Sequence, residues 1–153
     1  MLKALSTRAC LFGVLALAVS GAVFADQPAS GLGQAWPNAP DVSSNPNFHA
    51  YVFTLGGIQF VQINDVNGNV LGAVGSANGQ FITLPVGRFS QLVSTPQQAP
   101  AVAPAAATAT PTTVYQDSAT TVTATPLSDG TMQLKAAAAC SGDPALCSSH
   151  NPQ

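Results

Sequence analysis

The fold is decided by residues 47–88, which read NFHAYVFTLGGIQFVQINDVNGNVLGAVGSANGQFITLPVGR. Gly57, Gly68 and Gly79 lie 11 residues apart, and each ends a Gly-Gly or Asn-Gly dipeptide. Such dipeptides favour two-residue type I′ hairpin turns, because both central residues need positive φ. The stretch therefore predicts an all-β fold with a small antiparallel four-strand meander, its strands near residues 48–55, 58–66, 69–76 and 80–86. A β-solenoid is the rival interpretation, but three repeats are few for one.

With two-residue turns, the register of the meander follows by counting. One cross-strand row contains Val52, Val61, Val74 and Thr83, and the next contains Phe53, Phe60, Gly75 and Ile82. Side chains alternate between the two faces of a sheet. We expect the core face to be the one that carries Tyr51, Phe53, Leu55, Ile58, Phe60, Ala73, Ile82 and Leu84. On that face the ring of Phe60 can lie over the bare backbone of Gly75.

The opposite face carries the row Val52, Val61, Val74 and Thr83, a candidate association stripe with no assigned cover. From Val42 to Gly87 the only charged side chain is Asp65. The outer strands therefore lack the charges that usually guard sheet edges. Four short strands are also few for a core of their own. We expect the C-terminal segment, a second copy of the chain or another protein to cover the sheet.

The N-terminus has the parts of a secretory signal peptide. Lys3 and Arg8 precede an apolar run over residues 11–19, and Val23 and Ala25 are spaced like an A-x-A cleavage site. The run is shorter than the ~20 residues that span a bilayer, which disfavours an uncleaved anchor. We predict cleavage after Ala25, export to the periplasm or the extracellular space, and no membrane span in the mature chain.

The remaining segments are poor in structural signals. Residues 26–46 are predicted to be a loop, with Trp36 docked on the sheet, and residues 47–90 form the meander domain. Residues 91–113 are rich in Ala, Thr and Pro, and repeated proline excludes a continuous helix, so we expect an extended or disordered linker. Residues 114–153 are expected to be a weakly structured tail. This tail contains a candidate hairpin, restricted to an edge by Pro126, and a helical turn at residues 136–139.

Cys140 and Cys147 are the cysteines that remain after export. In an oxidising compartment, two cysteines predict a disulfide. The alternative adds His150 as a third soft ligand for copper or zinc, but a fourth ligand is missing. We therefore expect no metal and no cofactor. Asp65, Asn67 and Asn69 resemble the start of a calcium loop, yet Val70 and Ser76 occupy positions that need Gly and Glu.

Polar side chains form one further candidate site. The register places His49 opposite Asn64 and Tyr51 opposite Gln62, at one end of the predicted core face. These four residues are either a polar binding patch or a wet rim of the sheet.

Composition excludes several classes of function. The chain has 153 residues, of which 46% are hydrophobic and only 7% charged. Without the signal peptide, Arg88 and Lys135 stand against six Asp and no Glu, which excludes a basic nucleic-acid binder. No G-x-S-x-G, S-x-x-K, phosphate loop or dinucleotide fingerprint occurs, so we predict that the protein is not an enzyme.

The segment Trp36-Pro37-Asn38-Ala39-Pro40-Asp41-Val42, with Tyr51-Val52-Phe53 and Ile63-Asn64-Asp65, resembles small uncharacterised exported proteins of Gram-negative bacteria. The resemblance covers residues 36–90 and implies export without a mechanism. We expect a non-enzymatic envelope protein that acts as a structural or interaction module and self-associates through its charge-poor sheet. The alternative is an inhibitor or accessory subunit of another exported enzyme.

The signal peptide yields the first testable prediction. N-terminal sequencing of the exported protein should begin at Asp26, because the small residues Val23 and Ala25 fit the signal peptidase. A mature product that still carries residues 11–19 would contradict export by cleavage.

Overall fold

The first sheet is a four-stranded antiparallel meander. The computed structural model describes residues 28–140. Its first four strands are β1 (Phe48–Leu55), β2 (Ile58–Asp65), β3 (Val70–Ala77) and β4 (Gln80–Thr83), paired in chain order. The predicted meander is thus confirmed. β4 ends earlier than predicted, at Thr83, although the Leu84 N–H still donates to the Ala73 carbonyl at 3.1 Å.

The predicted register is also confirmed along both rows. Val52 pairs with Val61, Val61 with Val74 and Val74 with Thr83, and the row from Phe53 to Ile82 follows in step. Two of the turns are tight as predicted. Gly56 and Gly57 have φ of 58° and 81°, and Asn78 and Gly79 have φ of 50° and 76°.

The turn between β2 and β3 differs from the prediction. The Asp65 N–H donates to the Asn69 carbonyl at 3.0 Å, which leaves three residues in the loop instead of two. The register shifts between Ile63 and Asn64, and Leu71 is left without a direct partner on β2. This bulge restores the pairing predicted for the rest of the strand.

The C-terminal segment was predicted to be a weakly structured tail, but residues 112–138 form a second antiparallel sheet, and the candidate hairpin within it is confirmed. Its strands are β5 (Thr112–Gln116), β6 (Thr120–Pro126) and β7 (Met132–Ala138), in the order β5-β6-β7. The helical turn predicted at residues 136–139 is wrong, because β7 runs through most of it. Pro126 was predicted to require an edge strand, but it is the last residue of the central strand β6. It lies beyond the β5 ladder, where its carbonyl accepts the Thr108 N–H at 3.0 Å.

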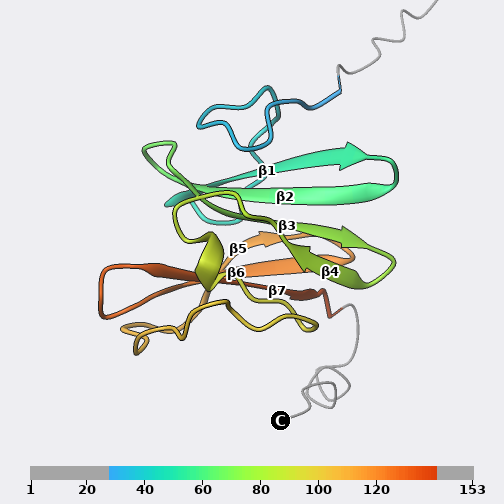
Figure 1. Ribbon diagram of the computed structural model, residues 1–153. Coiled ribbons are helices and arrows are strands. Elements are labelled where there is room, and N and C mark those ends of the chain that lie inside the picture. Colours follow the sequence, from blue (N-terminus) through green and yellow to red (C-terminus); the bar gives the residue numbers. More distant parts are fainter. Residues whose placement is uncertain (1–27, 141–153) are drawn as a thin grey trace, which may run out of the picture.

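The two sheets pack face to face and share one core (Figure 1). The core draws on both sheets and includes Ala50, Val61, Ile63, Leu71, Val74, Phe81, Val114, Tyr115, Val122, Ala124, Leu134 and Ala136. The main core therefore lies on the face opposite to the predicted one, because the valine face is buried against the second sheet. Tyr51, Phe53 and Ala73 of the predicted face are also buried, at 4%, 5% and 1% exposure, but outside this cluster. At the closest approach Gly72 has no side chain, and a Cβ there would lie 2.7 Å from Val93 and 2.9 Å from Leu134.

Residues 91–113, predicted to be a linker, begin inside the molecule. The short 3₁₀ helix η1 (Ser90–Leu92) leads into Val93, which is 1% exposed. Ser94 then pairs with β7, because its N–H donates to Leu134 and its carbonyl accepts the Ala136 N–H, both at 2.9 Å. The rest of the segment is largely exposed and runs below the second sheet (Figure 1). None of residues 28–140 belongs to a helix long and apolar enough to cross a membrane.

Connecting segments form hydrogen bonds with the two edge strands of the first sheet, which were expected to be open. On β4 the outward N–H groups of Phe81 and Thr83 donate to the side-chain oxygens of Gln97 and Gln98, at 3.2 and 3.4 Å. On β1 the N–H of Ala50 donates to the Asp41 carboxylate at 3.0 Å and its carbonyl accepts the Val42 N–H at 2.9 Å. The prediction that both outer strands are open templates is therefore wrong for β4 and for the first half of β1.

Two leucines test the face-to-face packing. Leu134 is 1% exposed between the sheets, whereas Leu55 is 73% exposed. Leu134→Ala should lower the free energy of unfolding by about 2–5 kcal/mol because it opens a cavity. Leu55→Ala, the matched control, should change it by less than about 0.5 kcal/mol. Equal effects of the two changes in urea unfolding would contradict the sandwich.

Candidate functional site

The candidate site is the outer face of the first sheet, which points away from the second sheet. Residues 28–41, called the strap below, cross one end of this face and leave the other end uncovered (Figure 1). The covered end is polar and the uncovered end is apolar. The polar end anchors the strap, and the apolar end is the exposed surface.

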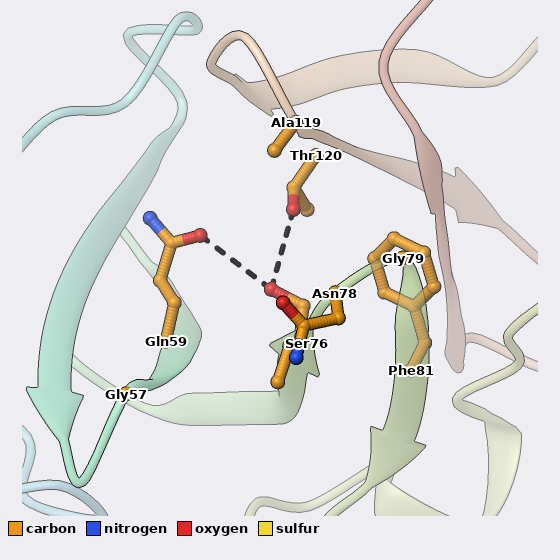
Figure 2. Close-up of a pocket in the computed structure, with 9 residues that line it drawn as sticks. Gly57, Gln59, Ser76, Asn78, Gly79, Phe81, Ala119 and Thr120 are labelled. Carbon is orange, nitrogen blue, oxygen red and sulfur yellow. Dashed lines mark hydrogen bonds between the residues drawn. The ribbon is translucent and has the colours of Figure 1, made fainter.

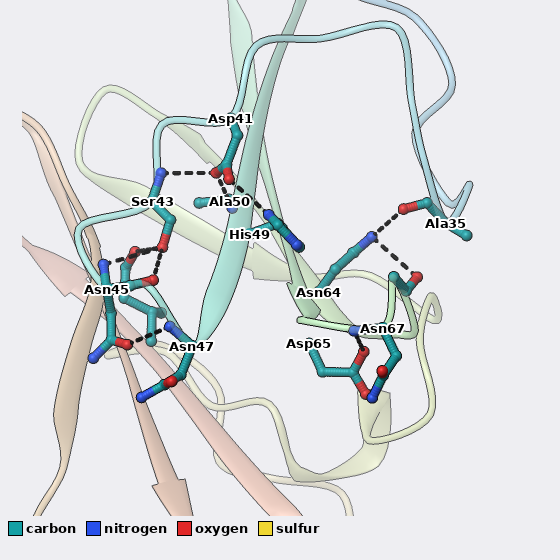
Figure 3. Close-up of polar contacts among 12 residues, drawn as sticks. Ala35, Asp41, Ser43, Asn45, Asn47, His49, Ala50, Asn64, Asp65 and Asn67 are labelled. Carbon is teal, nitrogen blue, oxygen red and sulfur yellow. Dashed lines mark hydrogen bonds and ion pairs between the residues drawn. The ribbon is translucent and has the colours of Figure 1, made fainter.

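At the polar end, two amide side chains hold the strap. Gln62 and Asn64 are both 0% exposed. The Gln62 amide accepts the Gly33 N–H at 2.6 Å and donates to the Gln34 carbonyl at 2.8 Å. Asn64 donates to the Ala35 carbonyl at 2.7 Å (Figure 3). Its amide oxygen accepts from Gln62 at 2.8 Å. Each buried amide is thus paired with strap backbone, as buried polar groups require.

An aromatic group continues the contact between the strap and the sheet. The Trp36 ring lies against the bare backbone of Gly68, where a Cβ would come within 2.6 Å of it. Its centroid is 5.3 Å from that of His49 in an edge arrangement, and His49 stacks on Tyr51 at 6.1 Å. The predicted docking of Trp36 on the sheet is confirmed, although 60% of its surface stays exposed.

Asp41 fixes the end of the strap against β1. Its carboxylate pairs with His49 Nδ1 at 2.7 Å and accepts the N–H groups of Ser43 and Ala50, both at 3.0 Å (Figure 3). Burial opposes ionisation of this carboxyl, but the hydrogen bonds from His49, Ala50 and Ser43 outweigh it and hold the pKa of Asp41 below its usual value. The ionised form is therefore the one that anchors the strap.

The four residues of the predicted polar patch pair with one another in the register expected from the sequence. His49 pairs with Asn64 and Tyr51 pairs with Gln62. Tyr51 is only 4% exposed, and the strap covers both amides. The four residues are therefore a strap anchor and do not form an open binding patch.

At the apolar end, the outer face is uncovered. Leu55 and Ile82 are 73% and 52% exposed, and Ile58, Phe60 and Leu84 are half-buried. Phe60 and Ile82 converge over Gly75, where a Cβ would lie 3.2 Å and 3.0 Å from them. The expected position of Phe60 over glycine is confirmed, but on the outside of the protein.

A shallow groove of about 290 Å³ separates the strap from this apolar end. Its sheet side is formed by Phe53, Leu55 and Phe60, and its strap side by residues 28–32. No charged side chain lines it among the described residues. The groove makes the apolar end concave, which favours contact with a protruding apolar side chain.

The predicted association stripe lies elsewhere. Val61 and Val74 are 0% and 2% exposed in the core between the sheets, with Val52 packed against them and Thr83 at the end of the row. The expectation of an uncovered stripe at Val52, Val61, Val74 and Thr83 is wrong, because the second sheet covers it. The sequence did contain a signal for the correct core face, in the alternation Val61-Gln62-Ile63-Asn64. The two amide side chains lie on the face opposite to the core between the sheets.

The cysteine site is only partly described. Cys140 is the last described residue, and Cys147 and His150 lie outside the described residues. The predicted disulfide stays a prediction. Within residues 28–140 no group of three or more His, Cys, Asp or Glu side chains is placed to hold a metal ion.

Comparison with known proteins adds no relative from which a role could be transferred. The chain matches no family model, no curated protein sequence and no solved structure. The outer face therefore has to be interpreted from its own geometry.

Asn64 tests the strap anchor, and Trp36 reports on it as the single tryptophan of the chain. Asn64→Leu should remove the bond to the Ala35 carbonyl and one of the three bonds of the Gln62 amide, which keeps Gly33 and Gln34, and should lower the free energy of unfolding by about 1–3 kcal/mol. Trp36 emission should shift to the red as the strap loosens. Asn67→Leu is the matched control, because Asn67 is exposed and its described hydrogen bond comes from the backbone N–H, which the substitution keeps. Unchanged emission and stability in Asn64→Leu would show that the amides do not hold the strap.

Proposed function

We propose that the protein is an exported, non-enzymatic structural or interaction module of the cell envelope that self-associates through the apolar end of its outer face. The observation that carries the proposal is the pair of exposed side chains Leu55 and Ile82, with Phe60 between them on a charge-free surface. Large apolar side chains gathered on an exposed surface are typical of interaction sites.

The lack of charge favours a second copy as the partner. In a two-fold symmetric contact the same surface lies on both sides, so a charged group near the axis meets its own copy. Between Val42 and Gly87 the only charged side chain is Asp65, at the far, polar end of the first sheet. The apolar end can therefore face itself without burying like charges.

The occupied edges support contact through the face. Gln97 and Gln98 bond the outward N–H groups of β4, and Asp41 and Val42 bond Ala50 of β1. Strand addition at β4 would have to displace these bonds first. Contact through the outer face leaves them intact.

The contacts of His49 support a role without catalysis. It is the one histidine among residues 28–140, and its described partners are Asp41 and the rings of Trp36 and Tyr51. Nucleophilic catalysis needs a hydroxyl or thiol within hydrogen-bond reach of such a base. The His49–Asp41 pair instead fastens the strap.

Ile82→Lys tests the proposal. Sedimentation equilibrium of the mature protein should show a dimer that forms with rising concentration, and Ile82→Lys should weaken it at least about tenfold by placing a charge in an apolar contact. The free energy of unfolding should change by about 0.5 kcal/mol or less, since Ile82 is half exposed.

Val102→Lys is the matched control. Val102 is 48% exposed, close to the 52% of Ile82, but lies in the loop after η1. It should leave the dimer unchanged. A wild-type protein that stays monomeric at every concentration would overturn self-association, and the inhibitor or accessory-subunit alternative would take its place.

A further inference from the structure

A cleft with a mixed polar and apolar lining lies at one end of the sandwich, between the two sheets. Three hairpin turns surround it and contribute Gly57, Gly79 and Ala119 to its rim (Figure 2). Its volume is about 390 Å³, in the lower part of the range of small-molecule sites. The small rim residues keep its mouth open, and Phe81 supplies an apolar wall.

The inside of the cleft carries three polar side chains that bond one another only weakly. The Ser76 hydroxyl donates to the Gln59 amide oxygen at 3.5 Å and shares a contact with the Thr120 hydroxyl at 3.4 Å (Figure 2). Good hydroxyl hydrogen bonds are about 2.7–2.8 Å long. Thr120 is 0% exposed and lies behind Ser76, whereas Gln59 and Ser76 are half-buried. A ligand hydroxyl that reaches Gln59 and Ser76 can therefore form shorter bonds than these two side chains form with each other.

The Gln59 amide is held in position from behind. Its Nε2 donates to the Tyr115 hydroxyl at 3.2 Å and to the Asp117 carboxylate at 3.0 Å. Both donor contacts lie on the nitrogen side of the amide. The Gln59 oxygen is thereby turned toward Ser76 and the cleft, as a fixed acceptor.

Both carboxylate oxygens of Asp117, behind the cleft, accept two hydrogen bonds each. One carboxylate oxygen accepts the N–H groups of Ala119 and Thr120, at 2.7 and 2.6 Å, and the other accepts Tyr115 at 2.7 Å and Gln59. Burial opposes its ionisation, but these bonds outweigh it and lower the pKa of Asp117. Burial and the neighbouring carboxylate together raise the pKa of Tyr115, which keeps its hydroxyl as a donor.

We propose that this cleft binds a small, neutral, hydroxyl-bearing ligand such as a single sugar ring, with Gln59 and Ser76 as the recognising side chains and the buried Thr120 hydroxyl holding Ser76 from behind. None of the described lining residues is charged, so the lining offers an ionic ligand no counter-charge. The Gln59 amide oxygen accepts from the ligand, and the Ser76 hydroxyl accepts or donates. The proposal concerns the end of the sandwich and is independent of the outer face.

Amide NMR spectra of the mature protein, titrated with glucose and separately with calcium chloride and sodium phosphate, test this site. Glucose should produce saturable shifts at Gly57, Gly79, Ala119 and Thr120. Thr120→Val removes a buried hydroxyl at nearly constant shape and should weaken binding about 3- to 10-fold, the effect of one hydrogen bond. Thr121→Val is the matched control, because Thr121 is the next residue of β6 and does not line the cleft.

A rim variant keeps the test decisive if Thr120→Val does not fold. Ala119 is exposed at the mouth, so Ala119→Leu should block glucose with the fold retained, whereas Ser118→Leu beside it should not. Saturable shifts from calcium or phosphate alone, unsaturable shifts from glucose, or equal binding by the Ala119→Leu and wild-type proteins would each overturn the proposal.

Discussion

The contact between the two sheets is the constraint on which the rest of the structure depends. Val61, Ile63 and Val74 of the meander are buried against the second sheet, whose Leu134 fills the space left by Gly72. Because side chains alternate along each strand, burial of this face turns Leu55, Phe60 and Ile82 outward. The same contact therefore stabilises the fold and creates the apolar surface from which we infer self-association.

Charge-poor sheets need another means of limiting strand addition, and here the connecting segments supply it. Residues 41–45 bond β1 through Ala50 and β5 through the Val114 carbonyl, which accepts the Ser44 N–H at 2.9 Å. Residues 93–98 pair with β7 through Ser94 and bond β4 through Gln97 and Gln98. Side-chain amides and backbone groups of the connecting segments thus limit pairing with another strand, as lysine and proline do on many edge strands. Of the first sheet, this leaves the outer face and the second half of the β1 edge for association.

Much of the first sheet could be predicted from sequence, because its determinants are local. Glycine-containing turns set the register, and counting paired Val52 with Val61 and Phe60 with Gly75 correctly. The choice of core face could not be made locally, since it depends on which residues the distant β6 and β7 cover. The β-branched residues of segment 112–138 indicated a hairpin, but its weak apolar pattern, rich in Thr and Ala, did not predict an ordered second sheet, whose order comes from tertiary packing. The cleft around Gln59 and Thr120 was missed for the same reason, because its walls come from both sheets.

Concentration-dependent methyl NMR of the mature protein tests the central claim most directly, since it compares the two faces of one sheet in a single sample. The account predicts that the methyl resonances of Leu55, Ile58 and Ile82 move as the protein is concentrated, while those of Val61 and Val74 stay fixed in the core. Movement confined to the methyl groups of Val61 and Val74, or to the methyl group of Thr83 on the β4 edge, would contradict it.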